Sequence, residues 1–174
     1  MGDDDKVLLL PGTDESEKIE VTRKAAYMSE LMRSMLTDDD DETPEIPLLE
    51  VSKEILYKVV DFLNHHKDDP MAKIEKPIKT NDIEQIVGEW DAKFIAFDDD
   101  QDTLFKVILA ANYLDIPSLL DLGICKIACM IKGKSSDEVK TMFKFQKEIT
   151  PEQEKSIREE NPWLFEIVSK TTDA

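Results

Sequence analysis

Residues 102–133 read DTLFKVILAANYLDIPSLLDLGICKIACMIKG, and this stretch decides how the rest of the chain folds. Its first half carries Leu104, Ile108 and Ala111 at the spacing of one helix face, which predicts an α-helix. Further apolar residues cover nearly the whole circumference of that helix, so we expect it to be buried on most sides. A stretch this apolar predicts the core on which the other elements pack.

A proline divides the stretch into two helices. Ile116 precedes Pro117, and because a residue before proline avoids helical geometry, we expect the first helix to end at Ile116. Pro117 suits the first turn of a second helix, where its missing N–H is not needed. Gly133 is a suitable left-handed residue to end that second helix. The second helix continues the apolar pattern through Leu119, Leu120, Ile124, Ile127, Ala128 and Ile131.

Two short strands and one helix are predicted near the N-terminus. Residues 7–10 form a short apolar run of strand character, and residues 11–14 form a turn. Ile19 and Val21 alternate with polar residues, as in a half-buried strand, so the two strands are expected to pair as a hairpin. Thr22 suits the N-cap of a single helix whose apolar stripe we interpret as core filling. That stripe comprises Ala25, Met28, Leu31, Met32, Met35 and Leu36.

A third strand and another helix follow an acidic run. Residues 38–42 are interpreted as a solvated loop, because they lack the spacing and the turn glycine of a calcium loop. Residues 46–51 predict a strand, and Ser52 suits the N-cap of the next helix. Residues 68–70, Asp-Asp-Pro, are expected to end that helix. Its buried face is predicted to comprise Ile55, Leu56, Val59, Val60, Phe62 and Leu63.

The middle of the chain predicts an insertion and then a return to the core. Residues 71–88 have mixed charge and low apolar content, so we expect a surface insertion that is partly disordered. Residues 90–94 predict a short helix. Residues 98–102 supply negative charge and a cap to the start of the central hairpin.

The C-terminal part of the chain, residues 134–174, predicts short helices attached to a domain of residues 1–133. Ser135 and Glu138 form one capping box, and the Thr-Pro-Glu-Gln at 150–153 forms a second. Large apolar residues on short helices either dock on the chain's own core or form a binding face for another protein. They are Val139, Phe143, Phe145, Ile149, Ile157, Trp163, Leu164 and Phe165.

Charge restricts the class of partner. The formal net charge is -17 and the sequence pI is near 4.5, which argues against nucleic acid and anionic membranes. No apolar run approaches the roughly 20 residues of a membrane helix, and the acidic start is unlike a secretory signal. With only two cysteines, we expect the cytoplasm and the nucleus. Neutral or basic proteins are the expected partners.

No residue pattern argues for catalysis, a metal or a cofactor. The chain lacks phosphate-binding loops and the nucleophile motif of hydrolases. His65 and His66 point about 100° apart on a helix, so we interpret them as interacting with its negative end rather than sharing a metal. Cys125 and Cys129 share a helix face and are interpreted as buried thiols rather than zinc ligands. An enzyme that uses the acidic loops with a metal is the alternative that a chelator would test.

Four motifs occur in an order that is typical of one known family. They are LFKVILAANYLDIPSLL at residues 104–120, HHKDDP at residues 65–70, WD at residues 90–91 with Phe94, and REENPW at residues 158–163. Together they span most of the chain, and they resemble the S-phase kinase-associated protein one family, the adaptors of SCF ubiquitin ligases.

The resemblance implies an α/β (α+β) fold of the BTB/POZ type, with a small three-stranded sheet wrapped by helices and a C-terminal helical extension. It implies a non-catalytic adaptor that bridges a cullin to F-box substrate receptors. Asn112 and Tyr113 lie where the family meets the cullin. This pair is polar within an apolar helix, which favours a surface position, although an internal hydrogen bond for each is the alternative. The expected F-box-binding residues are Phe143, Phe145, Ile149, Ile157, Asn161 and Trp163.

A self-associating BTB/POZ scaffold, unconnected with ubiquitin ligation, is the alternative function. The aromatic extension after Gly133 discriminates between the two, because a self-associating module does not need it. For the adaptor, we also expect a weak homodimer when no partner is bound.

Overall fold

The computed structural model describes residues 5–12, 17–36, 43–97, 100–143 and 150–160, and it divides the chain into two units. The first unit is Met1–Gly133 and the second is Lys134–Ala174. The strands of the first unit are β1 (Lys6–Pro11), β2 (Ile19–Thr22) and β3 (Glu45–Leu48). Its helices are α1 (Arg23–Ala26), α2 (Glu30–Met35), α3 (Lys53–His66), the 3-10 helix η1 (Ile83–Gln85), α4 (Glu89–Phe94), α5 (Gln101–Tyr113) and α6 (Pro117–Ile131). The second unit contains α7 (Ser136–Met142) and α8 (Pro151–Glu160).

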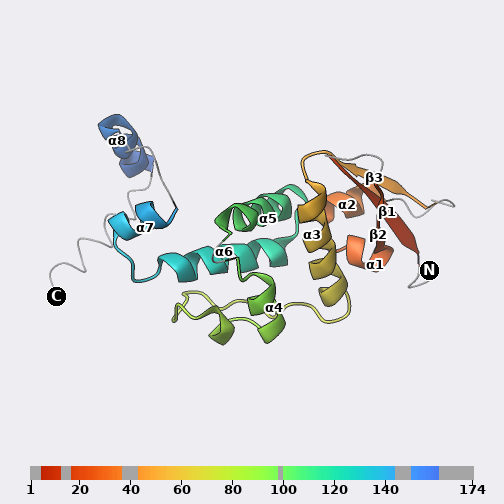
Figure 1. Ribbon diagram of the computed structural model, residues 1–174, viewed down its shortest axis with the longest axis horizontal. Helices are drawn as coiled ribbons and strands as arrows, with labels where there is room; N and C mark the ends of the chain where they lie inside the picture. Colours follow the sequence, from red (N-terminus) through yellow and green to blue (C-terminus); the bar gives the residue numbers. More distant parts are fainter. Residues whose placement is uncertain (1–4, 13–16, 37–42, 98–99, 144–149, 161–174) are drawn as a thin grey trace. The chain divides into compact units, whose positions relative to one another are not determined.

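The three strands form one mixed sheet in the order β2-β1-β3. β1 pairs with β2 as the predicted antiparallel hairpin, with Val7 opposite Val21, and it pairs with β3 in parallel, with Leu9 opposite Ile46. These four side chains are buried, because alternate residues of each strand point into the core. The small sheet with helices around it confirms the predicted mixed α/β fold of the BTB/POZ type (Figure 1).

The turn after β1 depends on a glycine. A Cβ atom at Gly12 would lie 1.9 Å from the backbone oxygen of Leu49, in the turn after β3. Only a residue without a side chain allows the two turns to approach this closely. Gly12 thereby fixes how the parallel strand pair ends.

The helix predicted after β2 is broken, which corrects the expectation of one continuous helix. Thr22 caps α1 as predicted, but α1 ends after one turn and Ser29 caps a separate helix, α2. The Ser29 hydroxyl accepts a hydrogen bond from Met32 N at 3.1 Å and donates one to the Leu114 carbonyl oxygen. Leu31 N also donates to that carbonyl, at 3.4 Å. The break therefore joins the start of α2 to the end of α5.

Replacing Ser29 by alanine is expected to lower the free energy of unfolding by about 1–3 kcal/mol. The substitution removes the cap of α2, and it also removes a hydrogen-bond partner of the buried Leu114 carbonyl. Urea denaturation followed by circular dichroism measures this change. Ser34→Ala is the matched control, since the exposed Ser34 hydroxyl bonds only within its own helix; its effect is expected to stay within about 0.5 kcal/mol. Equal losses for the two variants would contradict the role given to Ser29.

Helix α3 lies between the sheet and the α5–α6 hairpin (Figure 1). Its predicted buried face is confirmed, because all six of the apolar residues named for it are buried. Ser52 occupies the N-cap position without making a side-chain cap hydrogen bond. α3 ends at His66, just before the Asp-Asp-Pro sequence that predicted its end. The helix therefore joins the sheet and the hairpin in one core.

The α5–α6 hairpin is confirmed, but two details of its prediction are wrong. α5 ends at Tyr113 rather than at Ile116, because Asp115 adopts a left-handed conformation with φ 50°. α5 is also not buried on most sides, since 66% of the Leu109 surface is exposed. Pro117 begins α6 as predicted, and Gly133, with φ 76°, follows its end. An apolar surface of α5 is thus left uncovered.

The segment 71–88 is anchored on the core, which corrects the expectation of a partly disordered surface insertion. Ile74, Ile83 and Val87 are buried and belong to the main hydrophobic cluster. Only a few apolar residues are needed to hold a short segment, so its low apolar content was misleading. The segment leads into α4, which confirms the helix predicted at residues 90–94.

Candidate protein-interaction surfaces

An open cavity of about 720 Å³ lies against α5 in the first unit. We call it the α5 cavity. One wall comes from the loop and first turn of α3, with Glu50, Val51, Ser52 and Ile55. The other wall comes from α5, with Lys106, Leu109, Ala110, Asn112 and Tyr113. The cavity has an apolar floor between charged and polar edges, which suits a protruding side chain of a protein partner.

Asn112 and Tyr113 both lie at the surface, at the edge of the α5 cavity. Tyr113 is 38% exposed and Asn112 is also exposed. Leu109 precedes them by three and four positions, which places the three side chains on one side of the helix. The structure thus favours the surface position over the internal hydrogen bonds that were the alternative. Their role in binding a cullin stays a prediction.

A second apolar surface runs along α6. Leu120, Ile124, Ile127 and Ile131 follow one another at helical spacing and form what we call the α6 stripe. Ile124 is 50% exposed and Ile131 is 39% exposed. Leu120 and Ile127 are partly buried. A row in which exposed apolar side chains lie beside partly buried ones is a feature of protein-binding helices.

Another side of α6 packs on α5, and this contact leaves the α6 stripe uncovered. A Cβ atom at Gly123 would lie 2.5 Å from Ile108 Cγ1, so the two helices approach closely at this glycine. Leu119, Leu122 and Cys125 are also buried. The apolar pattern predicted that the whole hairpin lies in the core, and it gave no sign that Ile124 and Ile131 lie at the surface.

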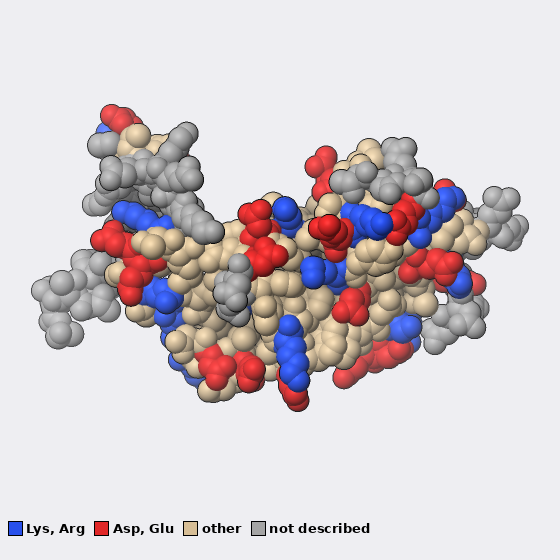
Figure 2. All heavy atoms as spheres, viewed as in Figure 1, with Lys and Arg blue, Asp and Glu red and all other residues tan. Residues whose placement is uncertain are grey.

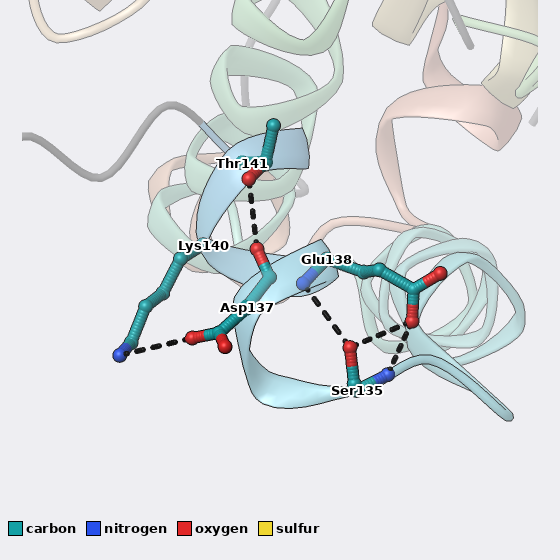
Figure 3. A network of polar contacts seen from close by, with 5 residues as sticks. All are labelled: Ser135, Asp137, Glu138, Lys140 and Thr141. Atoms are coloured by element: carbon teal, nitrogen blue, oxygen red, sulfur yellow. Dashed lines mark hydrogen bonds and ion pairs between the residues drawn. The ribbon is translucent and has the colours of Figure 1, made fainter.

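Both capping boxes of the second unit are confirmed, and the first is drawn in Figure 3. The Ser135 hydroxyl accepts a hydrogen bond from Glu138 N at 3.4 Å, while Ser135 N donates to Glu138 Oε2 at 2.7 Å. The Ser135 hydroxyl also donates to Glu138 Oε2, at 2.7 Å. The two bonds that the Glu138 carboxylate accepts, from the Ser135 backbone and from its hydroxyl, hold the pKa of Glu138 below its usual value. Thr141 also donates to the Asp137 carbonyl at 2.8 Å. The network fixes the first turn of α7.

The structure describes only part of the expected F-box-binding set. Phe143 follows α7 and is partly buried, and Ile157 belongs to α8, although its side chain lies outside the described part. Phe145, Ile149, Asn161 and Trp163 lie outside the described residues. The role of the whole set in F-box binding stays a prediction.

The paired histidines lie in the last turn of α3, as predicted, and they also join α3 to α4. His66 is buried, with Nε2 2.7 Å from Asp91 Oδ1 and Nδ1 2.9 Å from the Asp69 carbonyl oxygen. His65 stacks on Trp90 with ring centroids 3.7 Å apart. The sequence did contain these residues, but it gave no sign that residues 25 positions apart would meet.

Within the part of the chain that the structure describes, no group of three or more histidine, cysteine or acidic side chains is placed to hold a metal ion. Cys125 and Cys129 are free, and burial raises the pKa of Cys125 to about 11, which keeps this thiol protonated and unreactive at neutral pH. Among the described helices, none has the length and apolar character needed to cross a membrane. Figure 2 shows acidic side chains spread over the visible face, with lysine and arginine side chains between them.

Comparison with known proteins assigns the family. Residues 6–68 match the Skp1 family, tetramerisation domain, and residues 117–164 match the Skp1 family, dimerisation domain. The chain is 44% identical over 155 residues to the S-phase kinase-associated protein 1 homolog of Tetrahymena thermophila, with 89% of this chain and 92% of that protein covered. It is also 44% identical over 162 residues to the E3 ubiquitin ligase complex SCF subunit sconC of Emericella nidulans, with 91% and 96% covered. The sconC protein of Arthroderma benhamiae is 44% identical over 157 residues. The chain therefore belongs to the Skp1 family.

Proposed function

We propose that this protein is the adaptor subunit of an SCF-type cullin–RING ubiquitin ligase and that it bridges a cullin scaffold to F-box substrate receptors. Its relatives are named as SCF subunits, and the observation that carries the proposal is the pair of separate surfaces on one hairpin. An adaptor works by holding two partners at a fixed separation, so it needs two surfaces and a rigid connection between them. It needs no catalytic group of its own.

The α5 cavity is the surface proposed for the cullin. Leu109 provides exposed apolar area, and Asn112 and Tyr113 add hydrogen-bonding groups and an aromatic ring beside it. Aromatic and apolar anchors at the centre of an interface, with polar groups around them, carry most of the energy of protein association. α3 forms part of one wall of the cavity and contacts the sheet, so the surface exists before the partner arrives.

The α6 stripe is the surface proposed for the F-box. The expected F-box-binding residues of the second unit are proposed to bind it as well. An F-box that covers Ile124 and Ile131 would remove two exposed isoleucines from water, which contributes about 1.5–3 kcal/mol for each side chain fully buried. In the second unit, the two capping boxes lower the cost of ordering α7 and α8 for binding.

The α6 stripe also accounts for the proposed behaviour of the free protein. Without an F-box, two copies that meet through their exposed isoleucines would form a weak homodimer. We place the protein in the cytoplasm and the nucleus, where reducing conditions suit two free, buried cysteines.

Affinity purification from the cells of origin, followed by mass spectrometry, tests this function. The expected result is that a cullin and one or more F-box proteins are recovered together with the chain. Recovery of the chain with copies of itself and with neither class of partner would contradict the adaptor role and support the self-associating scaffold.

A further inference from the structure

The last turn of α5 carries both residues proposed to contact the cullin, and it ends in an uncommon backbone conformation. Asn112 and Tyr113 are the last two residues of the helix. Leu114 is its C-cap, and Asp115 follows with a φ of 50°. Residues other than glycine rarely adopt this left-handed conformation, because the Cβ atom crowds the backbone. Such a conformation persists where surrounding contacts hold it in place.

The contacts that hold this turn come from the start of α2. The Ser29 hydroxyl and Leu31 N both donate to the Leu114 carbonyl oxygen, the second of them at 3.4 Å. Glu30 N donates to the Asp115 carbonyl oxygen at 3.1 Å. Two successive carbonyls of the turn thus accept hydrogen bonds from three successive residues of another element. We call this set of bonds the Ser29 joint.

The Ser29 joint is itself fixed to the core. Ser29 is buried, and its backbone N donates to the Ala26 carbonyl oxygen at 3.0 Å, while its carbonyl accepts from Arg33 N at 2.9 Å. Ala26 belongs to α1, which contacts the sheet and α3. The start of α3 lines one wall of the α5 cavity, and the end of α5 lines the other. The joint therefore helps to set the two walls of the cavity relative to each other.

We propose that Ser29 is a positioning residue for cullin binding, which holds the last turn of α5 so that Asn112 and Tyr113 lie at the edge of the α5 cavity. This inference rests on the proposed function, because it concerns the same surface. Ser29 acts through the turn and does not touch the partner, since it is buried and does not line the cavity. Without its hydroxyl, the turn would be correctly formed for only part of the time, and the apparent affinity for the cullin would fall by that fraction.

The first test replaces Ser29 by alanine in the full chain. Titration calorimetry with a cullin N-terminal domain is expected to show binding weakened about three- to tenfold, because the competent turn is less populated. The affinity for an F-box protein should stay within about twofold, since the α6 stripe is separate from the joint. Hydrogen exchange on the free chain should become faster at residues 112–116. Together these readouts separate positioning from a general loss of stability.

Val87→Ala is the control for lost stability. Val87 is buried, but it belongs neither to the Ser29 joint nor to the lining of the α5 cavity. Truncating this side chain is expected to destabilise the core while both affinities stay within about twofold.

The second test acts on the other side of the joint, at Asp115, whose side chain is exposed. Asp115→Gly and Asp115→Val remove the same carboxylate, so they change the net charge equally. Glycine adopts a φ of 50° without strain, whereas the β-branched valine is disfavoured there. Asp115→Gly should keep cullin binding within about twofold, and Asp115→Val should weaken it about three- to tenfold. If Ser29→Ala does not fold, this pair decides by the same criteria.

The outcomes separate this inference from the proposed function. Normal cullin binding by the unaltered chain, with unchanged affinity in Ser29→Ala and Asp115→Val, would overturn the positioning role and leave the adaptor function standing. An equal loss of F-box binding in Ser29→Ala, or an equal loss of cullin binding in Val87→Ala, would show a general effect of stability and would also overturn it. Absence of cullin binding by the unaltered chain would overturn the proposed function, and the positioning role with it.

Discussion

A chain with both Asn112→Lys and Tyr113→Lys should lose cullin binding and keep F-box binding. Replacing groups at the centre of an interface costs about 2–4 kcal/mol, which corresponds to a loss of about 30- to 700-fold in affinity. Two lysines at the edge of the α5 cavity remove the aromatic ring and the amide and would bring two charges into a contact that must exclude water. Titration calorimetry with a cullin N-terminal domain, and separately with an F-box protein, measures both affinities.

The matched control exchanges the same two residue types on another helix. Asn64 and Tyr57 are exposed on α3, outside the α5 cavity, so Asn64→Lys with Tyr57→Lys should leave cullin binding within about twofold. Thermal unfolding should be little changed in either double variant. Unfolding of the Asn112 and Tyr113 variant, or the same loss of cullin binding in the control, would show that these two residues are not the cullin contact.

The second large effect is expected at the α6 stripe. Ile124→Asp with Ile131→Asp should weaken F-box binding by more than about 100-fold, because the interface loses two apolar side chains and must bury two carboxylates. Cullin binding should be unchanged, since neither residue lines the α5 cavity. Surface plasmon resonance with an F-box protein and with a cullin domain measures the two affinities on one sample.

The control for the α6 stripe is Met35→Asp with Tyr57→Asp, which places the same charges on exposed apolar residues outside both surfaces. It should bind the F-box normally. If the α6 variant loses cullin binding to the same extent, the stripe supports the hairpin itself and the two-surface proposal loses one of its surfaces.

Local patterns predicted most of the fold. The alternation at Ile19 and Val21 predicted β2, and Thr22 was correctly predicted to cap a helix. The cap expected within residues 98–102 is Asp100, at the start of α5. These signals are read from neighbouring residues, so one sequence is enough to find them. The break at Ser29 was not predicted because its cause is a bond to Leu114, which lies 85 positions away. The meeting of His66 and Asp91 was missed for the same reason.

The surfaces were predicted unevenly. Asn112 and Tyr113 stood out because they are polar within an apolar helix, and the structure places both at the surface. Ile124 and Ile131 did not stand out, because a helix that is apolar all round gives no contrast between its buried and its exposed side. The anchoring of residues 71–88 on the core was hidden by composition, since a segment of low apolar content resembles a loose loop until Ile74 is found buried.

The central claim is that one hairpin holds two partners on separate surfaces. Its most direct test is the mass of the complex that forms when all three proteins are mixed. Size-exclusion chromatography with light scattering on this chain, a cullin N-terminal domain and an F-box protein should give one 1:1:1 complex. The affinity for each partner should be the same whether or not the other is already bound, because the α5 cavity and the α6 stripe share no residue. Displacement of the cullin by the F-box protein, so that only pairwise complexes form, would contradict the account.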